Sequence, residues 1–261
     1  MLKKLNLSIL LIIFSTGSFA QMTKDIFPLT REFKKGGFYV APLATISIGN
    51  KAEDFYSTED TNYTYEVIGR GKWGYGVELG WYHSFKEPYF IHYLEAGISY
   101  RVFRGAAEHE GTLDNQLTKT TYKSDNTFSN QYISAAIRAV NAKQLGEKSF
   151  LSTALGLNYN YQIAENYERS DFYPLDDEEF LKESSLQLHL QMGVGFRVSR
   201  QLILMPTIET PLITALPFDN LNPAFPFFNA SYQPIIIGLR FIFIREDPMN
   251  CNAPVYEGIS H

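Results

Sequence analysis

Cysteine is almost absent from this 261-residue chain, in which Cys251 is the only one. A single thiol cannot close an intrachain disulfide, so a disulfide-stapled fold is excluded. A basic excess is also absent, since 23 Lys and Arg residues stand against 28 Asp and Glu residues. The formal net charge of -5 therefore excludes the basic surface that nucleic-acid binding requires.

Long apolar runs are missing after the first twenty residues. Those twenty, MLKKLNLSILLIIFSTGSFA, contain two lysines, an apolar stretch over residues 5–14, and small residues at Ser18 and Ala20. This pattern is typical of a secretory signal peptide that is cleaved after Ala20. An N-terminal membrane anchor is the alternative, but the apolar stretch is too short for it. We therefore expect residues 1–20 to be a signal peptide and the mature chain to leave the cytoplasm.

Strict alternation of apolar and polar residues is abundant. In SSLQLHLQMGVGFRVS, residues 184–199, every second position is apolar and the intervening positions hold Gln, His, Gly and Arg. Successive side chains of a strand point to opposite faces, so this pattern predicts a long β-strand with one apolar face. A soluble sandwich gives the same alternation, but usually over only about five or six residues.

Seven further segments carry strand patterns. The eight expected strands cover residues 38–48, 73–85, 89–103, 131–142, 150–163, 184–199, 202–212 and 233–244. Their connections alternate between short ones, at 86–88, 143–148 and 199–201, and long ones, at 49–72, 105–130, 164–184 and 213–232. Short periplasmic turns and long external loops are typical of bacterial outer-membrane barrels.

These observations predict an all-β fold, an eight-stranded antiparallel transmembrane β-barrel with short periplasmic turns and long extracellular loops. We expect a periplasmic N-terminal segment at 21–36, the barrel at 37–244 and a periplasmic tail at 245–261. An even number of strands places both termini on the periplasmic side. The expected location is the bacterial outer membrane.

The last expected strand contains a recognisable motif. In PIIIGLRFIF, Gly238, Phe241 and Phe243 have the glycine-x-x-aromatic-x-aromatic spacing of a barrel-assembly signal. With the strand pattern, the chain resembles small outer-membrane barrels of the OmpA/OmpX type, and most closely the PorT-like barrel domains of Bacteroidota. The resemblance covers residues 37–244 and implies insertion by the barrel-assembly machinery. The tail after the final strand departs from many such barrels, which end at the terminal Phe.

The alternation also predicts which charged side chains face the lumen. They are Glu78, Glu95, Arg101, Arg138, Arg197, Glu209 and Arg240. Glu209 faces inward only if the preceding turn has three residues; a two-residue turn would face it toward lipid, which is costly.

Glu78 and Glu95 are equidistant from the expected turn at 86–87, which places them directly opposite each other. Facing carboxylates could share a proton or do acid/base work. We favour a salt-bridge plug instead, because buried like charges need compensation and arginines are available.

Signals for catalysis or for a metal site are weak. The five histidines (His83, His92, His109, His189 and His261) show no metal-ligand spacing. His109 and His189 fall near the expected outer rim, but neither has a motif partner. The acidic run Asp176–Phe180 could bind calcium, although a solvated loop is the simpler reading. We expect no enzyme activity and no cofactor or metal.

The fourth long loop has few charges and many aromatic residues. Phe218, Phe225, Phe227 and Phe228 lie close together there with three prolines, which makes this loop a candidate partner-docking site. The alternative is that these side chains fold onto the barrel rim or into lipid. The unpaired Cys251 in the tail leaves an intermolecular disulfide open.

The sequence therefore favours a structural or accessory subunit with a filled lumen. Its expected partners are outer-membrane lipid and an outer-membrane or periplasmic protein of a secretion or assembly machinery, with no nucleic acid. A small passive channel and a rim enzyme acting on lipid or protein remain as alternatives, because an eight-stranded barrel holds little more than its own side chains.

Overall fold

The computed structural model describes residues 35–58, 61–85, 90–115, 118–146, 148–168, 183–216, 222–227 and 230–245. Several sequence-based predictions concern residues outside these ranges. They are the signal peptide at 1–20, most of the segment 21–36, the turn at 86–88, the acidic run at 176–180, Phe218, Phe228, Cys251 and the tail beyond residue 245.

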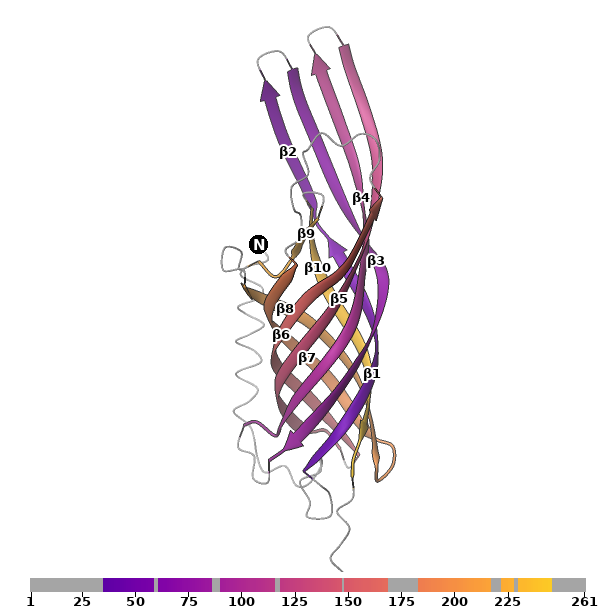
Figure 1. The fold of residues 1–261 in the computed structure, drawn as a ribbon, viewed down its shortest axis with the longest axis vertical. Coiled ribbons are helices and arrows are strands. Elements are labelled where there is room, and N and C mark those ends of the chain that lie inside the picture. Colours follow the sequence, from indigo (N-terminus) through magenta and orange to yellow (C-terminus); the bar gives the residue numbers. More distant parts are fainter. Residues whose placement is uncertain are drawn as a thin grey trace, which may run out of the picture.

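Ten strands form one antiparallel sheet (Figure 1). They are β1 (Gly36–Gly49), β2 (Lys51–Thr58), β3 (Thr61–Ser84), β4 (Tyr93–Asn115), β5 (Thr118–Gln144), β6 (Ser149–Glu168), β7 (Ser184–Arg197), β8 (Leu202–Leu216), β9 (Phe225–Phe227) and β10 (Ala230–Phe243). The sheet closes because β1 pairs with both β3 and β10, so that eight strands make a ring in the order β1-β3-β4-β5-β6-β7-β8-β10. The predicted eight-stranded antiparallel barrel is confirmed. Within the described part of the chain, no helix has the length and apolarity needed to cross a membrane.

Side chains alternate between the inside and the outside of the ring, as the sequence pattern predicts. On β7, Gln187, His189 and Gln191 are buried in the lumen, whereas Phe196 at the other parity is 46% exposed. On β3, the outward side chains Trp73, Tyr75, Val77, Leu79 and Trp81 are all exposed. The outside of the barrel wall is therefore apolar, and polar side chains of β7 lie inside it, whereas soluble proteins seldom expose such a continuous apolar surface.

The prediction of long loops is wrong for two segments, because both form β-hairpins. The segment 49–72 contains β2 and the first half of β3, which pair from Lys51↔Ile68 to Thr58↔Thr61. The segment 105–130 continues β4 and β5, which pair without a break up to Asn115↔Thr118. The polar composition predicts loops, but cross-strand pairing keeps these segments in the sheet.

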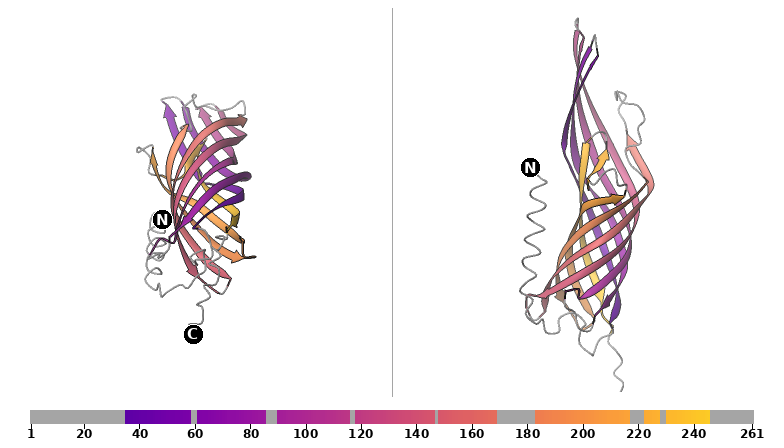
Figure 2. Two further views of the ribbon diagram at one scale, coloured as in Figure 1. Left: turned by 60° about the horizontal axis from the view of Figure 1, so that its bottom comes forward. Right: turned by 90° about the vertical axis from the view of Figure 1, so that its left-hand side faces the viewer.

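The two hairpins together form a four-stranded extension of the barrel wall, made of β2 and the upper parts of β3, β4 and β5. Figures 1 and 2 show it rising beyond the ring. Strands β3 and β4 pair along it from Thr61↔Asn115 to Lys72↔Arg104, and a register shift between Lys72 and Gly76 separates it from the barrel wall.

The opposite end of the barrel carries the short connections. They span 85–92, 145–148 and 198–201. Phe38 of β1 pairs with Phe243 of β10, so the first and last strands of the ring begin and end there as well. Strand β4 begins at Tyr93 rather than at the expected residue 89, which lengthens the connection and sets the register of β3 against β4.

Apolar side chains fill the lumen at both ends. Near the short connections, one cluster comprises Tyr39, Tyr82, Tyr93, Val140, Ala142, Phe150, Ala154, Ile203, Met205, Ile242 and Ile244. At the other end, two clusters comprise Val67, Ala107, Phe128, Phe227, Ala230 and Tyr232, and Ala41, Leu43, Phe103, Tyr132 and Ile236. A polar middle layer therefore lies between two apolar layers.

Glycines make room for the large lumen side chains. A Cβ at Gly80 would overlap the ring of Tyr39, which is 1% exposed, and a Cβ at Gly195 would overlap the ring of Phe150. Both glycines face the lumen, so the backbone approaches rings that cross the barrel. Filling of the lumen by aromatic residues thus depends on small residues on the facing strands.

We predict that Gly80→Ala lowers the folding stability by about 1–3 kcal/mol, the usual cost of an extra group in a packed core. The measurement is the urea midpoint of the barrel refolded in detergent. Gly146→Ala is the matched control, because its Cβ would meet only the Ser149 hydroxyl, at 3.2 Å. An unchanged midpoint for Gly80→Ala would contradict the packing of Tyr39 against this strand.

Candidate functional site

The middle layer of the lumen is a cluster of charged side chains. Six of the seven predicted lumen residues lie together there, and each is at most 2% exposed. They are Glu78, Glu95, Arg101, Arg138, Glu209 and Arg240. They come from β3, β4, β5, β8 and β10, so the cluster connects strands from around the ring.

Glu78 accepts from several donors at once. Arg138 donates to it twice, from Nη1 to Oε1 at 2.6 Å and from Nη2 to Oε2 at 3.3 Å. The Tyr39 hydroxyl donates to Oε1 at 2.6 Å, and Arg240 Nη2 lies 3.3 Å from the same oxygen. Arg101 Nη2 lies 3.7 Å from Oε2. The carboxylate of Glu78 is therefore surrounded by three guanidinium groups and a hydroxyl.

Glu95 does not face Glu78, so the predicted pairing of the two carboxylates is wrong. Glu78 pairs with Ser99 and Glu95 pairs with Tyr82, because the connection between β3 and β4 is longer than a tight turn at 86–87. Arg240 bridges the two carboxylates, with Nη1 at 2.6 Å from Glu95 Oε2 and Nη2 at 3.3 Å from Glu78 Oε1. An arginine thus separates two groups that could otherwise have shared a proton.

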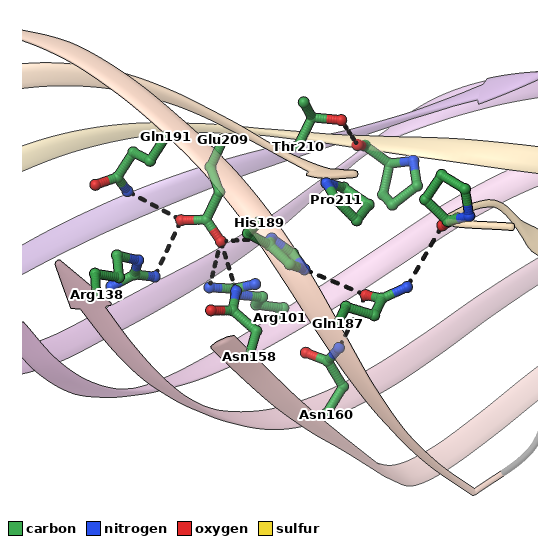
Figure 3. Close-up of polar contacts among 12 residues, drawn as sticks. Arg101, Arg138, Asn158, Asn160, Gln187, His189, Gln191, Glu209, Thr210 and Pro211 are labelled. Atoms are coloured by element: carbon green, nitrogen blue, oxygen red, sulfur yellow. Dashed lines mark hydrogen bonds and ion pairs between the residues drawn. The ribbon is translucent and has the colours of Figure 1, made fainter. Parts of the chain in front are cut away.

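Glu209 faces the lumen from β8, which agrees with a three-residue turn at 199–201. Figure 3 shows the donors around it. Arg138 Nη2 lies at 3.0 Å and Arg101 Nη2 at 3.4 Å. Asn158 Nδ2 and Gln191 Nε2 donate at 2.7 and 2.9 Å, and His189 Nδ1 lies 2.9 Å from Oε1.

The polar contacts continue from Glu209 toward the mouth of the barrel (Figure 3). His189 Nε2 lies 3.2 Å from Gln187 Oε1, which also accepts from Asn160 Nδ2 at 3.0 Å. Gln187 Nε2 in turn donates to the Thr214 hydroxyl at 3.1 Å. The prediction from sequence missed these neutral members and Tyr39, although the inward parity of their strands could have revealed them.

Arg197 lies away from the cluster, so its predicted place in the network is wrong. It is half-exposed at the end of β7 and donates to the Arg200 carbonyl at 3.5 Å. Six residues separate it from Gln191, which pairs with Glu209, and this corresponds to about 20 Å along a strand. The parity of Arg197 is correct, but its height along the barrel is not.

The cluster is electrically balanced. Three carboxylates, on Glu78, Glu95 and Glu209, meet three guanidinium groups, so their formal charges sum to zero (3 − 3 = 0). A buried charge is costly unless it is paired and hydrogen-bonded, and here every charged side chain has an oppositely charged neighbour. Among the described residues, no group of three or more His, Cys, Asp or Glu side chains could hold a metal ion.

Two phenylalanines of the fourth long loop, Phe225 and Phe227 of β9, pack against aromatic side chains of the barrel. Phe225 stacks on Tyr132 with centroids 5.8 Å apart, and Phe227 packs on Phe128 at 4.2 Å. Phe227 is only 2% exposed, so it is not available as an exposed docking anchor. Phe225 and Phe227 therefore follow the alternative prediction, in which these side chains fold onto the barrel rim. They do so because an apolar surface lies nearby, made of Phe103, Phe128, Tyr132 and Tyr232.

The two histidines that sequence places near the rim are both buried. His189 is 3% exposed inside the lumen, and His109 is 7% exposed on the inner face of the extension. Burial lowers the pKa of His109 from 6.5 to about 4, although the nearby Asp125 carboxylate partly opposes this shift. His109 is therefore neutral at physiological pH.

The assembly motif lies on the last strand of the ring, with its residues on both faces. Gly238 faces the lumen, where a Cβ would approach Thr207 Oγ1 to 2.8 Å. The outward Phe243 stacks on Phe38 of β1 with centroids 4.8 Å apart, and Phe241 pairs with Val40. The motif thus lies at the seam where β10 meets β1.

No protein-family model matches the chain, and no curated protein matches it. Several solved structures are distantly similar, among them three from Yersinia pestis, Escherichia coli and Neisseria meningitidis. Ail of Yersinia pestis, in complex with sucrose octasulfate, is 12% identical with a TM-score of 0.32 over 80% of this chain and 100% of that one. The outer-membrane protease OmpT of Escherichia coli is 10% identical with a TM-score of 0.29 over 84% and 99%. The translocator domain of the autotransporter NalP of Neisseria meningitidis is 8% identical with a TM-score of 0.28 over 87% and 91%.

We predict that Arg138→Leu destabilises the barrel by about 3–5 kcal/mol, because it removes the guanidinium that lies 2.6 Å from Glu78 and 3.0 Å from Glu209. The measurement is the thermal or urea midpoint in detergent. The second substitution in Arg138→Leu/Glu78→Gln restores charge balance and should recover part of the loss.

Lys123→Ala is the matched control. Lys123 pairs with Glu110 at 3.1 Å, but both side chains are more than half exposed, so the cost should stay below about 1 kcal/mol. Equal midpoints for the Arg138→Leu and Lys123→Ala variants would show that the lumen cluster does not hold the ring together.

Proposed function

We propose that this chain is a bacterial outer-membrane β-barrel that acts as a structural or accessory subunit and contacts another envelope protein. The observation that carries the proposal is a barrel with a filled, charge-balanced lumen beneath an extension with open sheet edges. The proposed orientation places the extension outside the cell and both termini in the periplasm. Insertion by the barrel-assembly machinery belongs to the same proposal, on the basis of the motif in β10.

The outward face supports the membrane location. Along β3 and the residue that follows it, apolar side chains extend from Trp73 to Phe85, and the next outward residues above them are Lys72 and Arg70. The 13 residues of this band span about 40 Å along the strand, which corresponds to a height of about 30 Å at the usual tilt. Aromatic side chains at both ends of an apolar band are typical of a membrane barrel.

The filled lumen argues against the passive channel. An ion moving along the barrel axis would have to displace the apolar layer around Tyr82 and Phe150, the charged cluster, and the layer around Phe103 and Phe227. The burial of His109 and His189 argues against a rim enzyme, because neither side chain is accessible to a substrate at the rim.

The extension supports a protein contact. Strand β2 pairs only with β3 among the described strands, and residues 118–126 of β5 pair only with β4. Two edges of the extension therefore carry backbone N–H and C=O groups that another strand could pair with. Lys123 lies on the β5 edge and marks a position at which a partner that contacts this edge can be captured.

We predict that the refolded protein inserts into lipid bilayers without forming a steady pore. With Trp73 and Trp81 both more than half exposed, brominated acyl chains should quench their fluorescence strongly. Planar bilayers containing the same preparation should show no stable conductance steps. Unquenched tryptophans would contradict the membrane location, and a reproducible open channel would restore the channel alternative.

We predict that a photo-crosslinking residue at Lys123, on the open β5 edge, captures one defined protein in native membranes. Lys143 is the matched control, since it is exposed on the same strand but near the short connections. An adduct at Lys123 alone supports contact through the extension. An adduct only at Lys143, or none at either position, contradicts it.

A further inference from the structure

Two cations stand opposite each other on the outer face of the sheet, at the base of the extension where it meets the barrel wall. Lys72 of β3 and Arg104 of β4 are direct cross-strand partners, and both side chains are exposed. Such partners lie only about 4.5–5.5 Å apart at their Cα atoms, and like charges in this arrangement destabilise a sheet. The pair therefore needs an explanation.

Neighbouring cations on the extension have carboxylate partners. Arg70 Nη2 lies 2.7 Å from Glu108, Lys51 Nζ lies 3.0 Å from Glu66, and Lys123 Nζ lies 3.1 Å from Glu110. No such ion pair forms at Lys72 or Arg104 within the described part of the chain. On its other side, Arg104 pairs with Ser129, whose side chain supplies a hydroxyl rather than a charge.

The cation pair lies at the boundary of the apolar band. Trp73, which directly follows Lys72, is 62% exposed and begins that band. The register shift between Lys72 and Gly76 turns both Lys72 and Trp73 outward. The Lys72 side chain therefore lies next to the indole of Trp73, on the side of the extension. An interfacial tryptophan sits at headgroup level, which places the two cations at the level of lipid headgroups.

We propose that Lys72 and Arg104 bind the phosphate of a phosphorylated lipid in the outer leaflet. The inference rests on the proposed membrane location and deepens it by naming a ligand class. A phosphate monoester carries a charge of about -1.5 to -2 at neutral pH, which two cations match. The Arg guanidinium can donate two parallel hydrogen bonds to phosphate oxygens, and the Lys ammonium adds a point charge.

The test measures lipid retention by native mass spectrometry of the full barrel, refolded and released from vesicles. The probes are diphosphoryl lipid A and its dephosphorylated form. Wild type should retain the phosphorylated lipid at least fivefold better than the dephosphorylated one, and Lys72→Gln/Arg104→Gln should abolish this preference. The matched control Lys143→Gln/Lys148→Gln, at the opposite end, should keep it.

Two further measurements separate the possible failures. Quenching of tryptophan fluorescence by brominated lipid checks insertion first. A lack of quenching would contradict the proposed membrane location and would not test the lipid site. Free inorganic phosphate at millimolar concentration should not displace the lipid; displacement would make this a site for soluble anions and overturn the proposal. Equal lipid retention by wild type and the Lys72→Gln/Arg104→Gln variant would overturn it as well.

Discussion

The bidentate contact of Arg138 with Glu78, together with its contact to Glu209, is the interaction on which the rest of the structure depends. Glu78 lies on β3 and Glu209 on β8, so one guanidinium on β5 ties strands that are far apart in the ring. Tyr39 extends this connection to β1, the strand that closes the barrel, through its bond to Glu78. Because the cluster is buried, each charge depends on its partners, and removing one of them leaves the others uncompensated.

The filling of the lumen by this cluster and by apolar side chains is the reason why the proposed function lies at the outer surface. The charge-balanced cluster lies between layers of apolar side chains, which is the ground for proposing a role other than a channel. The groups that remain available to other molecules are the outward side chains and the open edges of the extension. The proposed role is therefore to present a surface to another molecule.

The sequence predicts the ring and the inward charges, because alternation depends only on local chain geometry. Predictions from the sequence fail where contacts between distant segments determine the register or the conformation of a residue. The facing of Glu78 and Glu95 depends on the length of one connection, and the height of Arg197 depends on where β7 ends. The polar segments of the extension are strands because they pair with each other, and Phe227 is buried because Phe128 lies beneath it.

The loss of an ion pair has different consequences in the buried lumen and on the exposed extension. In the lumen, an unpaired charge has no solvent and is costly, so replacing Arg138 alone is expected to destabilise the barrel. On the extension, exposed pairs such as Lys123–Glu110 contribute at most about 1 kcal/mol, so these side chains can be altered for a partner without loss of the barrel. In the proposed membrane location, Lys72 and Arg104 lie between these limits, because headgroups would replace part of the surrounding water. A like-charged pair there is tolerable when the headgroups themselves supply the opposite charge.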